Sequence, residues 1–356
     1  MSDRGAVTVE RLEAAGPIAQ EWEDLASRVG VWPDLRPGWI EAWWRAFGEG
    51  RLEILAARSG GELVGVLPLV RRGRRVESPT NWETSLFGLV AAGPDAAAAL
   101  ADAVFAGRPR VVSLRFVDPA ELEPFRRAAR GRGYRVTERL MQRAPYLELT
   151  GEWEGIVSHL GRSLRANLRR RRRRLEEQGD LTLQVADGTE NLQALLEEGW
   201  LVEGTDWKLK EGTAIRSSPE TLGFYGEVSR WAAEQGILRL AFLRLDGRPI
   251  AFDLCFEDGG VHWLVKTGFD AEHRNLSPGN ILRHDMIKRA FDLGLTRYEF
   301  LGGEEAYKAD WTDRAHDRLH VQAFAPTPLG LARRLAERVR PAAGRILGPV
   351  LRRFRR

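Results

Sequence analysis

The sequence predicts an α/β (α+β) protein made of two consecutive units of similar topology. The chain has 356 residues, which is more than one average domain, and 43% of them are hydrophobic, which is enough for a core. A helix, a β-hairpin, a second helix and a strand also follow one another twice in the same order. We therefore expect one unit at residues 1–150, a second at 151–328 and a basic helical tail at 329–356.

The first copy of this pattern begins with a helix rich in aromatic residues, which are Trp39, Trp43, Trp44 and Phe47. Two β-rich runs within Leu52–Val70 then flank Gly60-Gly61, a dipeptide typical of a tight hairpin turn. Asp95–Ala106 is predicted to form the next helix and Arg110–Phe116 the strand that follows it.

The second copy also begins with an aromatic helix, which carries Phe224, Tyr225 and Trp231. The hairpin spans Leu238–Phe256 around Asp246-Gly247, and Gly247 lies 186 residues after Gly61. A helix at Gly279–Leu293 and a strand at Arg297–Leu301 complete the order. The repeated order therefore favours a duplicated unit.

The border between the units is expected between Tyr134 and Trp153. After it, residues 154–178 are predicted to form one long helix, because Leu160, Leu164, Leu168 and Leu175 recur at helical spacing. Arginines cover the rest of its surface, with an unbroken run at Arg169–Arg174. Such a run can contact a phosphorylated ligand, RNA or an anionic membrane, but we favour a solvated helix face.

The net charge of +4 is unevenly distributed. The segments 162–174 and 329–356 each carry +8, so the rest of the chain carries −12. The single cysteine, Cys255, excludes an internal disulfide, and no run of 18 apolar residues predicts a transmembrane helix. Met1–Pro17 lacks the apolar segment of a signal peptide. We expect a cytoplasmic protein whose basic tail allows peripheral contact with an anionic inner membrane surface.

The clearest candidate site is the segment His273–Leu282, HRNLSPGNIL, at the start of a predicted helix. Backbone N–H groups at a helix start bind phosphate or carboxylate well, and Arg274 could add charge. The alternative is an ordinary capped helix with Ser277 as N-cap and Pro278 at the first helical position.

Three further features could line a cleft. The segment Gly302–Trp311, GGEEAYKADW, follows a strand and offers Glu304 or Glu305 as a base and Tyr307 or Lys308 as a proton donor or anion ligand. The loop Thr205–Ile215, TDWKLKEGTAI, could hold an anion, or it is a surface loop pinned by Trp207. Asp253 lies in the middle of a strand, where a carboxylate is either ion-paired or a candidate general base. The six histidines show no metal-ligand spacing, so no metal is predicted.

Taken together, these segments resemble the CelD-type (cellulose-biosynthesis) GNAT acetyltransferases, a branch close to the FemAB-like transferases with two tandem GNAT units. The resemblance runs from Arg162 to Trp311. Besides the segments above, it includes SLRANLRRRRRRLEEQG, RLDGRPIAFDL and KTGFD. The spacing from Arg274 to Gly279 is similar to the Arg/Gln-x-x-Gly-x-Gly/Ala pyrophosphate loop of that family, with Ser277 in place of the first glycine.

The resemblance implies tandem GNAT-like domains with mixed, mostly antiparallel sheets flanked by helices. It implies transfer of an acyl group, such as acetyl from acetyl-CoA, directly to an amine or hydroxyl of a small-molecule, saccharide or cell-envelope acceptor. Carried over by position, the cofactor residues are Arg274, Ser277, Gly279, Asn280 and Ile281. The catalytic candidates are Asp253, Glu305 and Tyr307, and the substrate-binding candidates are Trp207, Lys208, Lys266, Asp270 and Lys308.

Two other functions remain open at this point. One is an aminoacyl-tRNA-dependent transfer like that of FemAB-like relatives, with the arginine helix on the tRNA. The other is a non-enzymatic assembly factor at a membrane surface, held there by the segment 329–356. We call Ser277-Pro278-Gly279 the SPG turn. The first unit has no counterpart of it, since its stretch Gly88–Pro94 lacks a basic residue. We therefore expect that it has lost cofactor binding and shapes the acceptor site.

Overall fold

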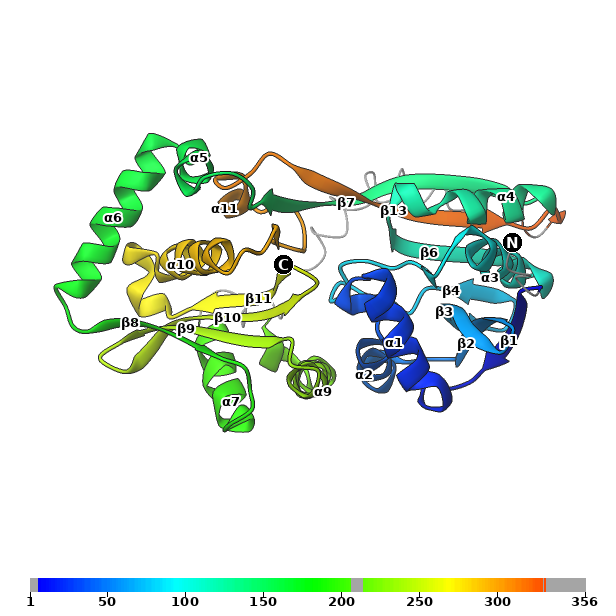
Figure 1. Ribbon diagram of the computed structural model, residues 1–356, viewed down its shortest axis with the longest axis horizontal. Coiled ribbons are helices and arrows are strands. Elements are labelled where there is room, and N and C mark those ends of the chain that lie inside the picture. The colour runs from blue at the N-terminus through cyan, green and yellow to red at the C-terminus, as the bar shows by residue number, and fades with distance from the viewer. Residues whose placement is uncertain (1–5, 206–213, 329, 331–356) are drawn as a thin grey trace, which may run out of the picture. The chain divides into compact units, whose positions relative to one another are not determined.

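The computed structural model describes residues 6–205, 214–328 and 330, and it divides the chain into two compact units (Figure 1). Unit 1 contains the chain up to Val29, then Glu49–Met141 and the part from Arg318 onward. Unit 2 contains Gly30–Gly48 and Gln142–Asp317. These borders interleave the chain and differ from the single border expected near residue 150. The expected basic tail at 329–356 lies outside the described residues, apart from Gly330.

Unit 1 is built on a sheet with the strand order β1-β2-β3-β4-β6-β13. Its strands are β1 (Thr8–Leu12), β2 (Arg51–Ser59), β3 (Glu62–Arg72), β4 (Arg75–Glu77), β6 (Val111–Val117) and β13 (Ala315–Phe324). Only β4 and β6 pair in parallel, and the short β5 (Val90–Ala91) pairs with β3. Helices α3 (Pro94–Ala106) and α4 (Glu123–Gly131) share a hydrophobic core with these strands, and α1 (Ala19–Val29) packs on β3 and β5.

Unit 2 repeats this plan with the strand order β8-β9-β10-β11-β12-β7. Its strands are β8 (Leu181–Ala186), β9 (Leu238–Leu245), β10 (Arg248–Asp258), β11 (Val261–Phe269), β12 (Arg297–Glu299) and the part of β7 (Arg135–Glu148) from Gln142 onward. Again one pair is parallel, namely β11 and β12. Both sheets are therefore mixed and mostly antiparallel, and the expected fold class and the duplication of the unit are confirmed.

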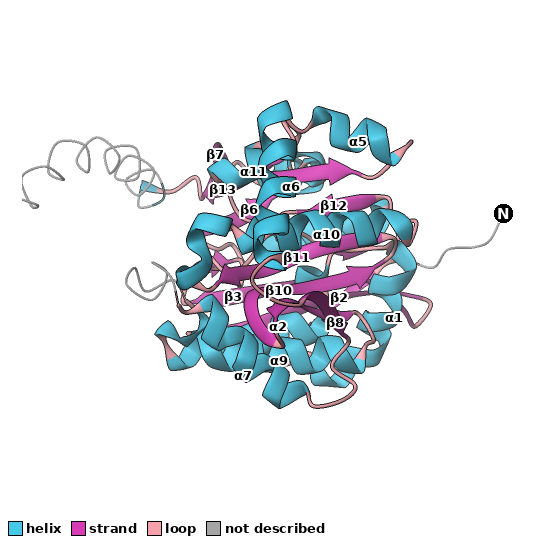
Figure 2. Ribbon diagram, turned by 90° about the vertical axis from the view of Figure 1, so that its left-hand side faces the viewer, coloured by secondary structure: helices cyan, strands magenta, loops and turns pink. Residues whose placement is uncertain are grey.

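The helices of unit 2 cover both faces of its sheet (Figures 1 and 2). Helix α10 (Pro278–Asp292) packs on one face, and α7 (Leu192–Glu203) and α9 (Pro219–Glu234) lie on the other. The other helices that the structure describes in this unit are α2 (Pro37–Phe47), α5 (Trp153–His159), α6 (Arg162–Glu176) and α11 (Ala306–Ala309). Short 3-10 turns complete the two units at Gly16–Ile18, Pro33–Leu35, Pro119–Glu121, Ile215–Ser217 and Ala271–Leu276.

The two units exchange their last strands along the chain. In unit 1, β13 pairs antiparallel with β6, from Leu319 opposite Val117 to Phe324 opposite Val111. In unit 2, β7 pairs antiparallel with β12, with Tyr298 opposite Leu147. The strand that follows β12 in the chain thus completes unit 1, and the strand that follows α4 completes unit 2.

Aromatic packing explains why residues 30–48 belong to unit 2. The ring of Trp39 in α2 lies edge-on against Phe224 in α9, with the ring centroids 5.1 Å apart. A Cβ atom built on Gly38 would lie 2.1 Å from the Trp231 side chain, so only glycine fits at this crossing. The two aromatic helices that mark the repeat in the sequence therefore pack against each other.

Both hairpins form as predicted. The turn residues Gly60 and Gly61 have positive φ angles of 57° and 89°, and Asp246 and Gly247 have 48° and 81°. Two successive residues with positive φ define the turn whose twist matches that of the strands. The hairpins are β2–β3 and β9–β10.

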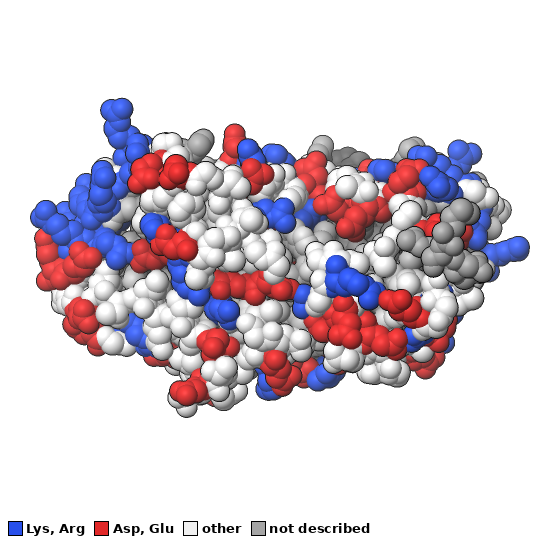
Figure 3. Space-filling model, in the orientation of Figure 1, with Lys and Arg blue, Asp and Glu red and all other residues white. Residues whose placement is uncertain are grey.

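The predicted single helix at 154–178 is wrong in one respect, because the chain forms two helices there. Leu160 and Gly161 have extended backbone angles, and they separate α5 from α6. Leu160, Leu168 and Leu175 are buried as expected. Leu160, however, lies between the two helices and not on the face of α6 that carries Leu168 and Leu175. Basic side chains gather over α6 (Figure 3).

Candidate functional site

The parallel pair β11 and β12 separates at its carboxyl end. The two strands pair only from Val261 opposite Arg297 to Trp263 opposite Glu299, although β11 continues to Phe269. A bulge at Val265 accompanies this, since Leu254 pairs with Lys266 and Cys255 with Leu264. The part of β11 beyond Trp263 therefore does not pair with β12.

The corresponding edge of unit 1 is closed. There β4 ends at Glu77. Beyond it, the short strand β5 takes the place of β4 beside β3. Phe87 then forms a parallel bridge to Val117, and its N–H donates to the carbonyl of Phe116 over 3.0 Å. Among the described residues, unit 1 thus has a bridge at this edge, whereas β11 beyond Trp263 has none to β12.

The SPG turn (Ser277–Gly279) follows β11 after the 3-10 turn Ala271–Leu276 and opens α10. Ser277 has a left-handed backbone (φ 48°, ψ 55°), the conformation that glycine adopts most easily, at the position where the resembled motif has glycine. Its hydroxyl does not cap the helix, as an ordinary N-cap would, but accepts a hydrogen bond of 2.6 Å from Nη1 of Arg171 in α6. The arginine helix therefore places a cation at the start of α10.

The backbone amides of this turn are only partly free. The amides of Asn280 and Ile281 both donate to the carbonyl of Ser277, over 3.0 and 3.3 Å, and Pro278 has no N–H. The amide of Gly279 has no acceptor in the part of the chain that the structure describes. The anion-binding capacity of the turn thus comes from one amide, the helix dipole and Arg171, rather than from several amides.

The other predicted cofactor residues lie around the same turn. Arg274 is exposed in the 3-10 turn Ala271–Leu276 before it, and Asn280 is half-buried. The side chain of Ile281 is buried in the core of unit 2, so only its backbone belongs to the turn. Asp270 is also buried; it accepts the amide of Glu272 and is ion-paired with Arg248 over 2.7 Å. Asp270 thus holds the turn in place.

A buried arginine that the sequence reasoning did not single out lies at the centre of the site. Arg283 of α10 is 2% exposed, and its Nη1 lies 3.6 Å from Oδ2 of Asp253 in β10. Its Nη2 donates to Oγ1 of Thr267 in β11 over 2.9 Å. Its guanidinium also lies 5.2 Å from the ring centre of Tyr307. Burial is the largest single influence and would lower the pKa of Arg283, but Asp253 together with Tyr298 and Tyr307 raises it, so Arg283 stays charged.

The one signal for Arg283 in the sequence is its position among apolar residues of α10. It lies within the buried set Ile281, Leu282, Met286 and Ile287, where a charge needs a partner. Asp253 is the matching buried charge in the middle of β10, and it is fully inaccessible to solvent. The sequence left Asp253 as either an ion-paired carboxylate or a candidate general base, and the structure shows it ion-paired with Arg283. Cys255, two residues on, is also buried, which raises the pKa of its thiol and makes it a poor nucleophile.

The loop after β12 brings Tyr307 to this arginine. Tyr307 is half-buried, and burial raises its pKa to about 12, opposed by the charge of Arg283. Lys308 is 3% exposed, and its Nζ donates to the carbonyls of Leu301 and Gly303 over 2.5 and 3.0 Å and pairs with Glu305. Lys308 therefore holds the glycine turn together and is not open to a substrate, whereas the Glu305 side chain is 55% exposed.

The remaining predicted substrate residues divide into two groups. Lys266 of β11 is half-buried, with its Nζ 5.0 Å from the ring centre of Tyr225 in α9. Trp207 and Lys208 lie outside the described residues. The structure thus brings the SPG turn, the part of β11 beyond Trp263, Arg283 and Tyr307 together around the carboxyl end of β11.

Comparisons with known proteins agree with this architecture. Residues 162–309 match the family model described as an acetyltransferase (GNAT) domain, about two fifths of the chain. No curated protein matches. The narrower resemblance to the CelD-type branch stays a prediction.

Several solved structures have the same fold. One is the C-terminal domain of a protein described as a lysylphosphatidylglycerol synthetase from Agrobacterium fabrum, with a TM-score of 0.60, 15% identity and coverage of 92% of this chain and 97% of that one. FemX has a TM-score of 0.60 at 13% identity over 88% and 96% of the two chains. L-PGS from Bacillus licheniformis has 0.53 at 14% identity over 85% and 96%. At these identities the likeness concerns the fold.

No helix among the described residues is long and apolar enough to cross a membrane. No group of three or more His, Cys, Asp or Glu side chains in the same residues is arranged as metal ligands would be.

Proposed function

We propose that the protein is an acyltransferase that moves an acyl group, such as acetyl, from acyl-CoA directly to an amine or hydroxyl of a small-molecule, saccharide or cell-envelope acceptor. The observation that carries the proposal is the separation of β11 from β12 beyond Trp263, in a strand that the 3-10 turn Ala271–Leu276 connects to the SPG turn. An extended thioester ligand needs strand-like partners along its length and an anion site at its end, and this segment offers both in sequence.

The turn would hold the diphosphate of the ligand. The amide of Gly279 and the positive end of the α10 dipole favour an anion, and Arg171 adds a full charge at Ser277. Arg274 is exposed in the preceding turn, close in sequence to the same anion site. The thioester carbonyl would accept hydrogen bonds from backbone N–H groups of β11 beyond Trp263, where β12 no longer pairs with the strand, and these would stabilise the oxyanion that develops on it.

Transfer then needs one proton removed and one proton supplied. The acceptor nitrogen or oxygen attacks the thioester carbon, the C–S bond breaks, and its electron pair leaves on sulfur. Tyr307 is the proton donor to that sulfur, because a phenol with a pKa near 12 is fully protonated at neutral pH. The acceptor's proton passes to a carboxylate, either directly or through water.

Glu305 and Asp253 remain the candidates for that carboxylate. Glu305 is exposed beside Tyr307 in sequence and can reach a soluble acceptor. Asp253 is buried against Arg283, so a proton would reach it only through an intervening group. The exposure of the Glu305 side chain favours Glu305 as the base. Asp253 would then hold the Arg283 guanidinium in place beside the Tyr307 ring.

Equilibrium dialysis with radiolabelled acetyl-CoA tests the donor. We expect saturable binding that Arg171→Gln weakens about tenfold, since hydrogen bonds involving a charged group contribute about 1.5–3 kcal/mol. The matched control is Arg173→Gln, on the same helix but 81% exposed and paired only with Glu177. Absence of binding at millimolar acetyl-CoA by a folded protein would contradict the acyl-CoA donor.

A second candidate is transfer from an aminoacyl-tRNA. It is favoured by the exposed side chains of Arg169, Arg170, Arg173 and Arg174 on α6 and by the fold shared with FemX. In that case, tRNA binding should weaken steeply with salt, because each phosphate contact releases counterions. Tight, salt-dependent tRNA binding together with no acetyl-CoA binding would select this function over the first.

A further inference from the structure

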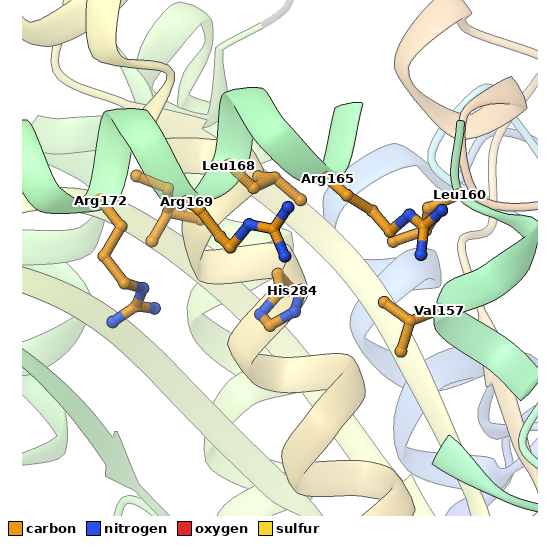
Figure 4. Close-up of a pocket in the computed structure, with 8 residues that line it drawn as sticks. Val157, Leu160, Arg165, Leu168, Arg169, Arg172 and His284 are labelled. Atoms are coloured by element: carbon orange, nitrogen blue, oxygen red, sulfur yellow. The ribbon is translucent and has the colours of Figure 1, made fainter. Parts of the chain in front are cut away.

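A pocket of about 200 Å³ lies in unit 2 between α5, α6 and the beginning of α10 (Figure 4). It is separate from the edge of β11, since no residue of that strand lines it. Its lining consists of four aliphatic and four basic side chains, which are Val157, Leu160, Leu168 and Ile281, and Arg165, Arg169, Arg172 and His284.

The aliphatic side chains form a floor that belongs to the core. Leu160, Leu168 and Ile281 are 2%, 8% and 1% exposed, and all three are part of the main hydrophobic cluster of unit 2. An apolar group placed on this floor would leave water and gain contacts at little cost in rearrangement. Since a water molecule occupies about 30 Å³ in the liquid, the pocket has room for about seven waters, or for a chain of comparable volume.

The basic side chains differ in whether the protein neutralises them. Arg172 is ion-paired with Asp285 of α10. Arg165 and Arg169 have neither an acid nor a hydrogen-bond acceptor in the described part of the chain, and the Nε atom of Arg165 is also buried. A buried polar atom without a partner is costly and calls for an explanation.

The geometry places these two cations on one side of the pocket. Arg165 and Arg169 are four residues apart and thus on the same face of α6. Figure 4 shows the guanidinium of Arg169 above the ring of His284 and that of Arg165 beside Leu160. Two like charges at this spacing repel each other, so an anion between them would relieve that repulsion and satisfy the buried Nε.

We propose that this pocket binds a single-chain acidic amphiphile, with its alkyl chain on the aliphatic floor and its carboxylate or phosphate held by Arg165 and Arg169. A free phosphate would gain nothing from the aliphatic floor, and a neutral chain would leave the buried Nε of Arg165 without an acceptor. The combination therefore selects a ligand that is apolar at one end and anionic at the other. The proposal does not depend on the acyltransferase function.

Equilibrium dialysis with the full chain tests this, using decanoate and decyl phosphate below their micellar concentrations. We expect saturable binding of at least one of the two, and their relative affinities tell which head group the arginines prefer. Decanol lacks the charge and acetate lacks the chain, so both should bind at least tenfold more weakly. Equal binding of decanol and decanoate would overturn the role of the arginines.

Variants locate the ligand. Arg165→Gln and Arg169→Gln should each weaken binding about tenfold, and Val157→Phe should weaken it by filling the pocket. Arg173→Gln, whose side chain is 81% exposed on the same helix, should leave it unchanged. If Arg165→Gln fails to fold, the exposed Arg169 still gives the test. An equal loss in all three arginine variants, or competition by adenosine 3′,5′-bisphosphate or tRNA, would show a general polyanion surface and overturn the proposal.

Discussion

Arg283 of α10 and Asp253 of β10 face each other in the interior of unit 2, with Nη1 and Oδ2 3.6 Å apart and both side chains almost completely buried. Thr267 and the ring of Tyr307 contact the same guanidinium. This charge pair therefore joins the helix that begins at the SPG turn to the strand in the middle of the sheet.

Replacing Arg283 with Met should strongly destabilise the protein. The change leaves the Asp253 carboxylate buried without this cation, which costs about 3–5 kcal/mol of unfolding free energy. Urea denaturation measures the cost. On the same helix, Lys288→Met breaks an ion pair with Asp292 whose side chains are 40% and 53% exposed, and it should cost less than about 1 kcal/mol. Similar costs for both variants would mean that the buried pair is unimportant.

Tyr307→Phe should lower kcat about 100-fold or more and change KM little, because it removes the proposed proton donor but keeps the ring on Arg283. Since its pKa is about 12, wild-type Tyr307 stays protonated from pH 7 to 10. If the wild-type activity falls as the pH rises from 7 to 10, another group causes the fall, and Tyr307→Phe should show the same fall. Steady-state rates as a function of pH check both points, and a loss of less than threefold would remove Tyr307 from the chemistry.

Glu121 of unit 1 should make stability depend on pH. Burial, and to a lesser extent the charge of Asp118, raise its pKa from 4.5 to about 7, opposed by Arg318. The folded state thus binds more protons than the unfolded state between these values, so the unfolding free energy falls as pH rises through this window. The total is at most about 3 kcal/mol.

Glu121→Gln should remove that dependence. The variant should be more stable than the wild type at pH 8 and similar to it at pH 4, as measured by urea denaturation at both pH values. Glu123→Gln is the control, since the Glu123 side chain is 58% exposed. An identical pH profile for Glu121→Gln and the wild type would show that this carboxyl titrates normally.

Two glycines next to the site should respond differently to alanine. A Cβ on Gly268 would lie 2.4 Å from Cα of Glu203, and that backbone cannot move without shifting α7. Gly268→Ala should therefore cost about 1–3 kcal/mol or more. On Gly279 the nearest atom is Cδ1 of Phe269 at 3.4 Å, so Gly279→Ala should fold with nearly full stability. Thermal unfolding of both variants distinguishes them, and equal stability would contradict the close approach of α7.

Lys308→Met should loosen the turn after β12. It removes the hydrogen bonds to the carbonyls of Leu301 and Gly303, at a cost of about 2–3 kcal/mol. Hydrogen exchange of the amides at 302–306 should become faster, while exchange in the β2–β3 hairpin of unit 1 stays unchanged. Unaltered exchange at 302–306 would show that the turn holds its shape without the ammonium group.

Local sequence signals were sufficient for the repeated elements. The turns at Gly60-Gly61 and Asp246-Gly247 form where predicted, because the backbone conformation they need is a property of a few adjacent residues. The helix after Pro278 and the strand before Gly302 follow from equally local signals. The left-handed backbone of Ser277 did not, since serine adopts it here with its hydroxyl bound by Arg171, 106 residues earlier.

Contacts between distant segments decided the rest. Leucine spacing alone could not show that Leu160 and Gly161 interrupt the arginine helix, because a face of leucines looks the same on one helix or two. Strand pairing joins β13 to β6 and β7 to β12, and backbone hydrogen bonds carry no mark in the sequence of which strand they will meet. The burial of Arg283 against Asp253 depends on how α10 packs on the sheet. A charged residue that would be expected at the surface from its type alone therefore lies at the centre of the site only after folding.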